Sequence, residues 1–217
     1  LVSAADPASE VILLQQLQPG GDHNGGTIAF GPNDHYLYVF WGDGGCCNDK
    51  FHNAQDLTAL LGKILRLDVR ASSTAQPYAI PPDNPFVGRK GARPEIFTFG
   101  QRNVTDFSWH PTTGELWTTE IAPMGGDEIN VLRAGGNYGW PLVSHGRAYP
   151  GARISQSPFL EGTVQPLIYW VPSIAVTGMT FYQGNVFTAW RKSAFVGGLR
   201  QGEVPRTGQM QRIEFND

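Results

Sequence analysis

The sequence has little of several features that would assign a protein to a class at once. Charged residues make up only 16% of its 217 residues, and Lys+Arg 16 against Asp+Glu 19 leaves a formal net charge of −3 with no basic run. Nucleic-acid recognition relies on clustered Lys and Arg, so no nucleic-acid partner is expected. No unbroken apolar run reaches membrane-spanning length, so no membrane span is predicted either.

Cysteine is scarce as well. Cys46 and Cys47 are the two cysteines, and because they are adjacent they cannot close a long loop with each other. Two free thiols, thiols with partners outside this chain, and a strained, redox-labile vicinal disulfide are all compatible with the pair. The opening residues, LVSAADPASE, lack the basic and apolar regions of a signal peptide, which indicates either a mature chain or a piece of a longer one.

Helical periodicity is rare. The best example is AQDLTALLGKI, residues 54–64, where three leucines fall on one face and predict one or two helical turns before Gly62. Elsewhere short apolar stretches alternate with turn residues. The 27 Gly, 16 Pro and 12% aromatic residues favour strands and turns, so the predicted fold class is all-β and residues 1–217 form a single domain.

One strand pattern recurs along the chain. TIAFGPNDHYLYVFWGDGG, DFSWHPTTGELWTTEIAP and MTFYQGNVFTAWRKSAFVGGL each indicate a hairpin. Each hairpin is followed by one more strand, in KILRLDV, DEINVLR and QMQRIEF respectively. The units begin roughly 70–80 residues apart, longer than the usual propeller repeat of about 40–50, so long loops are expected.

Such a repeat predicts the blades of a β-propeller, because radial repetition protects the edges of small sheets. A β-sandwich would explain the strands but not their recurring order. The chain holds three clear units and about four sheets, too few to close a ring. It is therefore expected to be an incomplete propeller domain with blades missing on one or both sides.

The stretch GGDHNGG, residues 20–26, contains the first candidate site. His23 can accept a proton near neutral pH, and Asp22 could orient the ring or bias its charge. The glycines after it leave room for a flat ligand. The alternative is an ordinary loop histidine in front of the strand that begins at Thr27.

Two further segments carry candidate ligand-binding groups. Arg102 and Asn103, adjacent after the strand EIFTF, suit a planar anion with several oxygens, although a surface ion pair beside a turn is the alternative. Arg200 follows two glycines and could reach a central site or remain a solvated strand-end arginine.

The segment EIAPMGGDEIN offers oxygen ligands for a hard cation. The turn at Ala122, Pro123 and Met124 can direct backbone carbonyls at a metal, with the carboxylates of Asp127 and Glu128 nearby. The segment lacks regular calcium-loop spacing, and GGNYGWP beyond it is also typical of a tight turn with a buried Trp140.

Together the segments resemble a known family. Ordered matches run through nearly the whole chain, in HNGGTIAFGP, GDGG, AQDLTALLGKILRLDV, PPDNPFVG, ARPEIFTFGQRN, PTTGELWTTE, GGDEIN, GGNYGWP, QPLIYWVPSIAVTGMTFY and FVGGL. In this order they resemble the soluble PQQ-dependent glucose/sorbosone dehydrogenases, including the aldose sugar dehydrogenases. The resemblance implies a six-bladed β-propeller with the quinone PQQ in a cleft near its axis, of which this chain looks like the middle part.

The resemblance also implies roles for individual residues. His23 matches the base that takes the proton of the sugar C1 hydroxyl while hydride passes to PQQ, with Asp22 as the acid beside it. Arg102 and Asn103 match a PQQ-binding pair, and Arg200 loosely matches a cofactor-facing basic position. The carbonyls of Ala122 and Pro123 match ligands of the calcium ion (Ca²⁺) against PQQ, and Glu128 and Tyr138 match positions that help hold a second calcium.

The implied activity is oxidation of aldose sugars to lactones, with electrons passed to an external acceptor in a periplasmic or secreted location. Two departures weaken the match: Ile121 and Ala122 stand where the family often has His or Gln and then Gly, and Val104 replaces a frequent Pro. The first alternative is a non-catalytic propeller of the hedgehog-interacting-protein-like type, which would have no need for His23, Arg102 and Asn103 to converge. A lactonase-type calcium propeller is the second.

Overall fold

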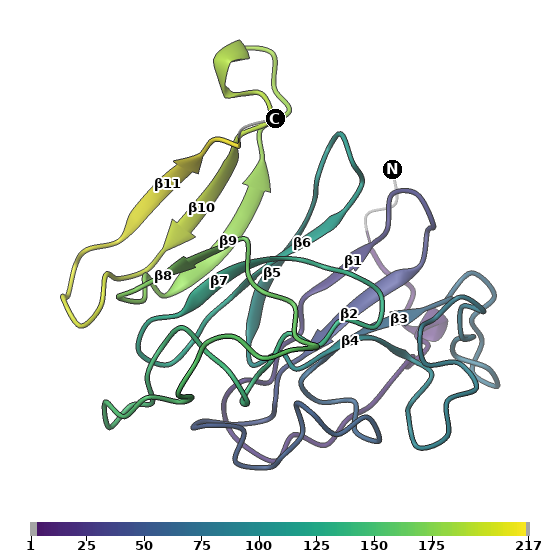
Figure 1. Ribbon diagram of the computed structural model, residues 1–217. Coiled ribbons are helices and arrows are strands. Elements are labelled where there is room, and N and C mark those ends of the chain that lie inside the picture. Colours follow the sequence, from purple (N-terminus) through teal and green to yellow (C-terminus); the bar gives the residue numbers. More distant parts are fainter. Residues whose placement is uncertain (1–3, 216–217) are drawn as a thin grey trace.

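Three antiparallel sheets form the protein, seen in a computed structural model that describes residues 4–215 (Figure 1). The first sheet contains, in order, β1 (Ile28–Phe30), β2 (Leu37–Trp41), β3 (Lys63–Leu67) and β4 (Ile96–Phe99). The second contains β5 (Val104–Trp109), β6 (Leu116–Glu120), β7 (Asp127–Val131) and β8 (Ile168–Trp170). The third contains β9 (Val176–Phe181), β10 (Ala194–Gly198) and β11 (Gln209–Ile213).

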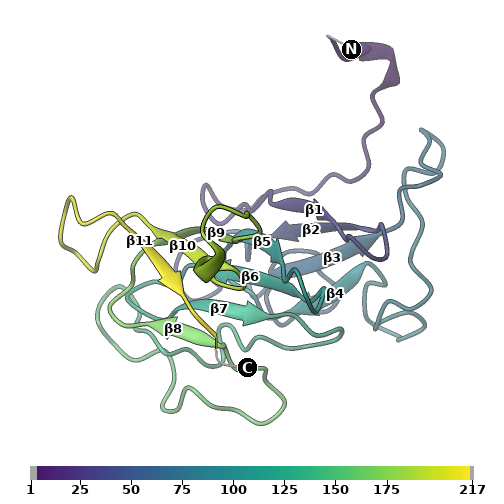
Figure 2. The same ribbon diagram turned by 90° about the horizontal axis from the view of Figure 1, so that it is seen from above.

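The repeat expected from the sequence is confirmed. Each of the three hairpins forms, and the strand that follows it pairs with the second strand of the hairpin. Seen from above, the sheets lie side by side as neighbouring propeller blades do (Figure 2). The described residues form three sheets rather than about four. The short edge strand β8, which follows the long loop 132–167, is a strand that the repeat did not predict.

The predicted helix over 54–64 is wrong. The described residues contain only two short 3₁₀ helices, at Pro7–Ser9 and Thr188–Trp190, and residues 54–62 form successive turns. The Nζ of buried Lys63 donates to the carbonyls of Asn53, Ala54 and Leu61 at 2.6, 3.2 and 2.8 Å. Because these carbonyls accept from Lys63, they are not available for the hydrogen bonds of an α-helix. The leucines therefore pack against the sheet from a series of turns.

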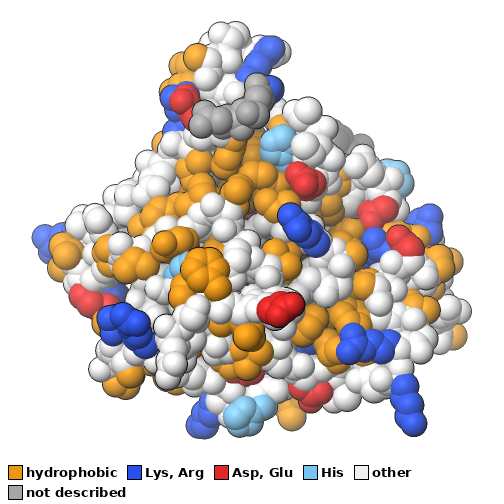
Figure 3. Space-filling model, viewed as in Figure 1, with side chains coloured by type: hydrophobic (Ala, Val, Ile, Leu, Met, Phe, Trp, Pro, Cys, Tyr) orange, Lys and Arg blue, Asp and Glu red, His pale blue; other side chains and the backbone are white. Residues whose placement is uncertain are grey.

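Two apolar clusters join the sheets in a row. The cluster between the first and second sheets includes Tyr38, Phe40, Phe97, Phe107 and Leu132. The cluster between the second and third includes Trp117, Ile129, Val176, Met179 and Val196. On the face shown in Figure 3, hydrophobic side chains also gather below the projecting loop 182–193, over β9 and β10. None of the helices in residues 4–215 has the length and apolar character to span a bilayer.

Strand order determines where the loops meet. In an up-and-down sheet, the segment that enters the first strand and the connection from the second strand to the third lie at the same end. His23 and Arg102 precede first strands, whereas Ala122 and Arg200 follow second strands. The fold therefore places these four residues at one end of the sheets, called here the cleft end.

Candidate active site

His23 is held by a buried carboxylate from the first sheet. Its Nδ1 lies 2.7 Å from Oδ1 of Asp43, and the side chains are 8% and 0% exposed. No described residue forms a hydrogen bond with Nε2. An Nδ1–H donated to Asp43 leaves Nε2 as the unprotonated nitrogen of a neutral ring, which is the arrangement that a general base requires.

The loop around His23 has a conformation that few sequences allow. His23 has a positive φ of 52°, and a Cβ on Gly42 would lie 1.9 Å from the carbonyl oxygen of His23. Gly42 therefore has to be glycine for the two segments to approach this closely. This contact places Asp43, the next residue, against the imidazole ring.

Arg102, which precedes the first strand of the second sheet, contacts the backbone of Asp43. Its carbonyl accepts a hydrogen bond from the Asp43 N–H at 3.0 Å, and its guanidinium lies 5.4 Å from the ring centre of Trp140. The Trp140 Nε1–H donates to Oδ2 of Asp43 at 2.8 Å. Asp43 thus connects His23 to Arg102 and Trp140, so the histidine and the arginine lie on the same side of the molecule.

Buried polar groups beside this network lack partners. Arg102 is 2% exposed and its Nη1 donates to the Ile121 carbonyl at 2.9 Å, but Nε and Nη2 have no partner among the described residues. No described residue hydrogen-bonds the Asn103 carboxamide either. Buried guanidinium donors without partners are costly, and an anion placed on them would remove that cost.

Two carboxylates face each other next to Arg102. Glu120 on β6 pairs in register with Glu128 on β7, and both border a cavity of about 20 Å³ together with Tyr138 and Ala122. Burial raises the pKa of Glu120 to about 7, and burial together with the charge of Glu120 raises the pKa of Glu128 to about 8. Two crowded carboxylates of this kind favour a bound cation, which would let both ionise.

The turn between β6 and β7 presents bare backbone oxygens. No described residue donates a hydrogen bond to the carbonyl of Ala122 or Pro123, whereas the Ala122 N–H is bonded to Oδ1 of Asp127 at 3.1 Å. Within residues 4–215 no group of three or more His, Cys, Asp or Glu side chains could hold a metal. Any cation here would therefore rely on carbonyls together with one or two carboxylates, a ligand set that suits Ca²⁺.

The remaining predicted residues lie around this centre. Arg200 forms an exposed ion pair with Glu203 and lines a cavity of about 230 Å³ with Pro123 rather than with Arg102. The Tyr138 hydroxyl donates to the Val131 carbonyl and accepts from the Arg133 N–H, so only its backbone oxygen remains for a cation.

Asp22 does not orient His23. Its Oδ1 accepts from the Cys46 N–H at 2.8 Å, and Cys46 is joined to Cys47 in a disulfide, which resolves the alternatives for this pair. The residue that orients His23 is Asp43, which the sequence did not identify as a site residue. The sequence also did not identify Trp140, which donates to Asp43, or Glu120, which pairs with Glu128. The one sequence signal for Asp43 is an acid inside the Gly-rich GDGG that follows β2.

A family model described as Glucose / Sorbosone dehydrogenase matches residues 4–214. Aldose sugar dehydrogenase YliI of Escherichia coli is 39% identical over 186 residues, which cover 85% of this chain and 47% of that protein. Quinoprotein glucose dehydrogenase B of Acinetobacter calcoaceticus is 30% identical over 224 residues, 94% of this chain and 45% of that protein. The HIPL2 protein of Arabidopsis thaliana is 38% identical over 157 residues, 66% of this chain and 21% of that protein.

Solved structures agree with this assignment. A glucose dehydrogenase superposes with a TM-score of 0.74 at 38% identity, covering 90% of this chain and 51% of the other. The PQQ-bound aldose sugar dehydrogenase of Streptomyces coelicolor gives a TM-score of 0.60 at 27% identity, over 89% and 50% of the two chains. The chain therefore spans about half the length of these dehydrogenases.

Proposed function

The chain belongs to the glucose/sorbosone dehydrogenase family, and from that membership we propose that it forms the catalytic part of a PQQ- and calcium-dependent aldose dehydrogenase. The reaction is oxidation of the C1 hydroxyl of an aldose to a lactone, with electrons passed on to an external acceptor. We place the protein in the periplasm or outside the cell, because quinoproteins of this family usually work there. The observation that carries the proposal is the convergence of His23 and Arg102 on Asp43.

The donor set fits an anionic quinone held on a cation. Arg102 has two buried donor nitrogens without partners. The half-buried Asn103 beside it has a carboxamide that no described residue hydrogen-bonds. The free carbonyls of Ala122 and Pro123 would supply oxygens for the calcium beside PQQ, and the carboxylate of Glu128 would supply one for the second calcium. Bound PQQ would provide the two-electron acceptor and calcium the Lewis acid that polarises it.

The chain's own residues then perform the proton chemistry. Asp43 accepts the Nδ1–H of His23 and keeps the unprotonated Nε2 available for the C1 hydroxyl proton of the sugar. Trp140 and the Arg102 backbone fix the position of Asp43, so the imidazole is oriented before substrate arrives. Arg102 and Asn103 would hold and orient the anionic cofactor rather than take part in proton transfer, whereas Arg200, in its ion pair with Glu203, lines the neighbouring cavity with Pro123.

The test compares the two carboxylates near His23. The protein with its complete natural chain is reconstituted with PQQ and Ca²⁺, and dye reduction by glucose is followed for wild type, Asp43→Asn and Asp22→Asn. Loss of the orienting partner is expected to lower kcat by about 10- to 100-fold, whereas Asp22→Asn changes it less than about threefold. Thermal unfolding of each variant checks that the fold is retained.

Equal losses for the two variants would remove Asp43 from the mechanism. Absence of any PQQ uptake or dye reduction by the wild-type protein would favour the binding-module alternative. The HIPL2 similarity keeps that alternative open, since it spans 66% of this chain.

A further inference from the structure

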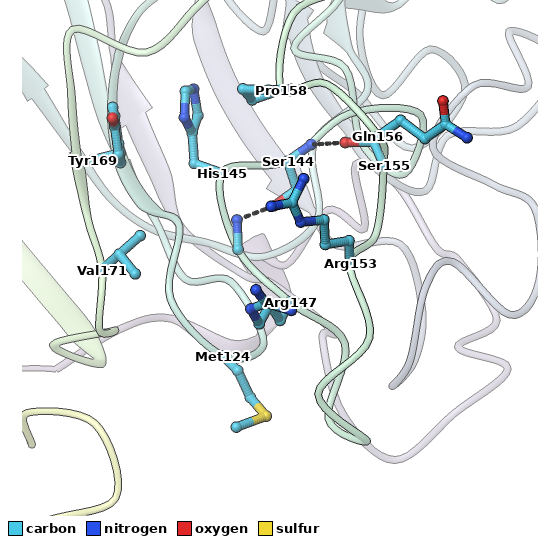
Figure 4. Close-up of a pocket in the computed structure, with 11 residues that line it drawn as sticks. Met124, Ser144, His145, Arg147, Arg153, Ser155, Gln156, Pro158, Tyr169 and Val171 are labelled. Carbon is cyan, nitrogen blue, oxygen red and sulfur yellow. Dashed lines mark hydrogen bonds between the residues drawn. The ribbon is translucent and has the colours of Figure 1, made fainter.

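A second cavity, of about 460 Å³, lies beside the proposed active site under the loop that joins β7 to β8 (Figure 4). Its volume is in the usual range of small-ligand sites. Met124 and Val171 border both this cavity and the 230 Å³ cavity that contains Pro123 and Arg200. Ser144 borders both this cavity and the small cavity beside Arg102 and Glu120, so the second cavity adjoins the proposed cofactor and calcium site on two sides. None of the proposed catalytic or cofactor-binding residues lines this second cavity.

The cavity is positively charged and contains no compensating acid. Arg147 and Arg153 line it, and none of its lining residues is Asp or Glu. Arg147 donates to the Gly151 carbonyl at 3.0 Å, and neither arginine forms an ion pair with any described residue. Figure 4 shows the Arg153 side chain running toward Ser144 and His145. Unpaired guanidinium groups in one hollow favour an anionic ligand, and they hold carboxylates and sulfates by paired hydrogen bonds.

The opposite wall is aromatic. The rings of His145 and Tyr169 stack with centroids 3.9 Å apart and planes 17° from parallel, and Tyr169 is still 51% exposed. A ring held flat in this way offers an apolar face for the C–H side of a sugar ring. The hydroxyl of Ser155, which accepts from the Ser144 N–H, adds a polar group suited to sugar hydroxyls, whereas the Gln156 carboxamide points away from the cavity (Figure 4).

The pocket is attached firmly to the proposed calcium turn. Met124 and Arg147 exchange two backbone hydrogen bonds, at 3.1 and 3.2 Å. A Cβ on Gly146 would lie 1.9 Å from the Gly125 carbonyl oxygen, so only glycine permits this approach. The backbone of Arg147 is therefore held in a defined position relative to the turn at Pro123, and a further β-bridge joins it to Arg153.

We propose that this cavity binds an anionic sugar unit, carrying a carboxylate or a sulfate, that is linked to the aldose being oxidised. The substrate is then an acidic oligosaccharide with a reducing end rather than a free monosaccharide. The placing of the reducing unit rests on the proposed dehydrogenase function. The binding of the acidic unit rests only on the cavity itself.

The test measures sugar preference in the protein with its complete natural chain, loaded with PQQ and Ca²⁺. The substrates are glucose, cellobiose, and cellobiose whose non-reducing unit carries a 6-carboxylate or a 6-sulfate. At least one acidic disaccharide is expected to show a kcat/KM about tenfold above that of cellobiose, through a lower KM. The two acidic substrates show which anion the pocket takes.

Arg153→Gln is expected to remove that tenfold preference while leaving glucose oxidation unchanged. Arg89→Gln, an exposed arginine on the β3–β4 loop, is the matched control and should keep it. Equal kcat/KM for cellobiose and both acidic disaccharides in the wild-type protein would overturn the proposal. The proposal would also be overturned if Arg153→Gln lowered kcat/KM for glucose as much as for the acidic disaccharides.

Titration calorimetry of the same disaccharides, without PQQ, separates this proposal from the proposed function. Binding of an acidic disaccharide that weakens about tenfold in Arg153→Gln supports the pocket even if no sugar is oxidised. Oxidation of glucose without any Arg153-dependent preference or binding would leave the dehydrogenase function standing and reject the pocket.

Discussion

Two corresponding turns at the cleft end differ in how fully their polar groups are paired. Asp43 follows β2 after Gly42, and Ala122 follows β6 after Ile121, so they occupy the same place in successive sheets. Asp43 is saturated: its oxygens accept from His23, the Gly45 N–H and Trp140. The second turn keeps unbonded carbonyls.

The Arg102 guanidinium next to that second turn is unsaturated too, because two of its buried nitrogens have no partner among the described residues. Glu120 and Glu128 each accept a hydrogen bond, from the Arg102 N–H and from the Asn130 carboxamide, but the two carboxylates crowd each other. Paired groups hold a geometry that the chain makes alone, whereas unpaired buried groups mark where a ligand would complete the structure. The saturated side is accordingly expected to govern proton transfer, and the unsaturated side to govern cofactor and metal binding.

Removing the imidazole should give the largest effect on the saturated side. His23→Ala is expected to lower kcat for glucose oxidation by about 10²-fold or more, because the general base is lost, while PQQ affinity stays nearly unchanged. Stopped-flow reduction of the bound cofactor measures the loss of rate, and fluorescence titration measures the affinity for PQQ. His52→Ala, an exposed histidine of the same region, should leave both unchanged. A His23→Ala protein that loses PQQ affinity instead would break the division between the two sides.

The loop behind Asp43 depends on one buried lysine. Lys63→Met would remove the Nζ donor from the carbonyls of Asn53, Ala54 and Leu61, and the Leu61 carbonyl would keep no partner among the described residues. The free energy of unfolding should fall by roughly 2–3 kcal/mol. Lys50→Met, on an exposed lysine of the same loop, should change it by less than about 0.5 kcal/mol. Urea unfolding gives both values.

Burial lowers the pKa of Lys63 to about 7, which gives this loss a pH dependence. Above pH 7 the folded protein binds fewer protons than the unfolded chain, so the lysine's contribution to stability rises with pH until the unfolded lysine also deprotonates. The gap between wild type and Lys63→Met should therefore widen from pH 7 to pH 9, by up to about 1.4 kcal/mol per unit. A gap that narrows with rising pH would contradict a depressed pKa.

Local pattern was sufficient for most of the fold. Alternating apolar residues around turns such as PTTG predict the three hairpins, because a strand buried on one face needs that alternation. The same reasoning failed at residues 54–62, where the leucine spacing is helical but Lys63 captures the carbonyls. That capture is a tertiary contact which no local propensity contains.

The candidate site, like the fold, could be predicted from the sequence only in part. His23, Arg102 and the turn at Ala122 stand out from the sequence through their neighbours and through family resemblance. Asp43 does not, because its role comes from contacts with His23 and with Trp140, which is far along the chain. Asp22, adjacent to the histidine in sequence, is instead turned toward Cys46.

Calcium should bind only on the unsaturated side, near the turn at Ala122 and the carboxylates of Glu120 and Glu128. A cation that lets Glu120 and Glu128 ionise should stabilise the fold by about 2.7 kcal/mol at a concentration one hundred times its dissociation constant, seen as a rise in Tm. Glu128→Gln is expected to remove most of that rise, and Glu161→Gln, at an exposed glutamate, none of it. The same rise in Glu128→Gln as in wild type would exclude this carboxylate as a ligand.

The smallest effect is expected where the two sides touch. Trp140→Phe keeps an aromatic ring under the Arg102 guanidinium but deletes the 2.8 Å hydrogen bond from Nε1 to Asp43. Asp43 keeps its bonds to His23 and Gly45, so one neutral donor is lost, worth about 1 kcal/mol or roughly fivefold in kcat. PQQ affinity should not change, because the cation–π contact remains. A fall in PQQ affinity without a fall in kcat would mean that Trp140 serves the cofactor side, and that Asp43 is held in place by the first sheet alone.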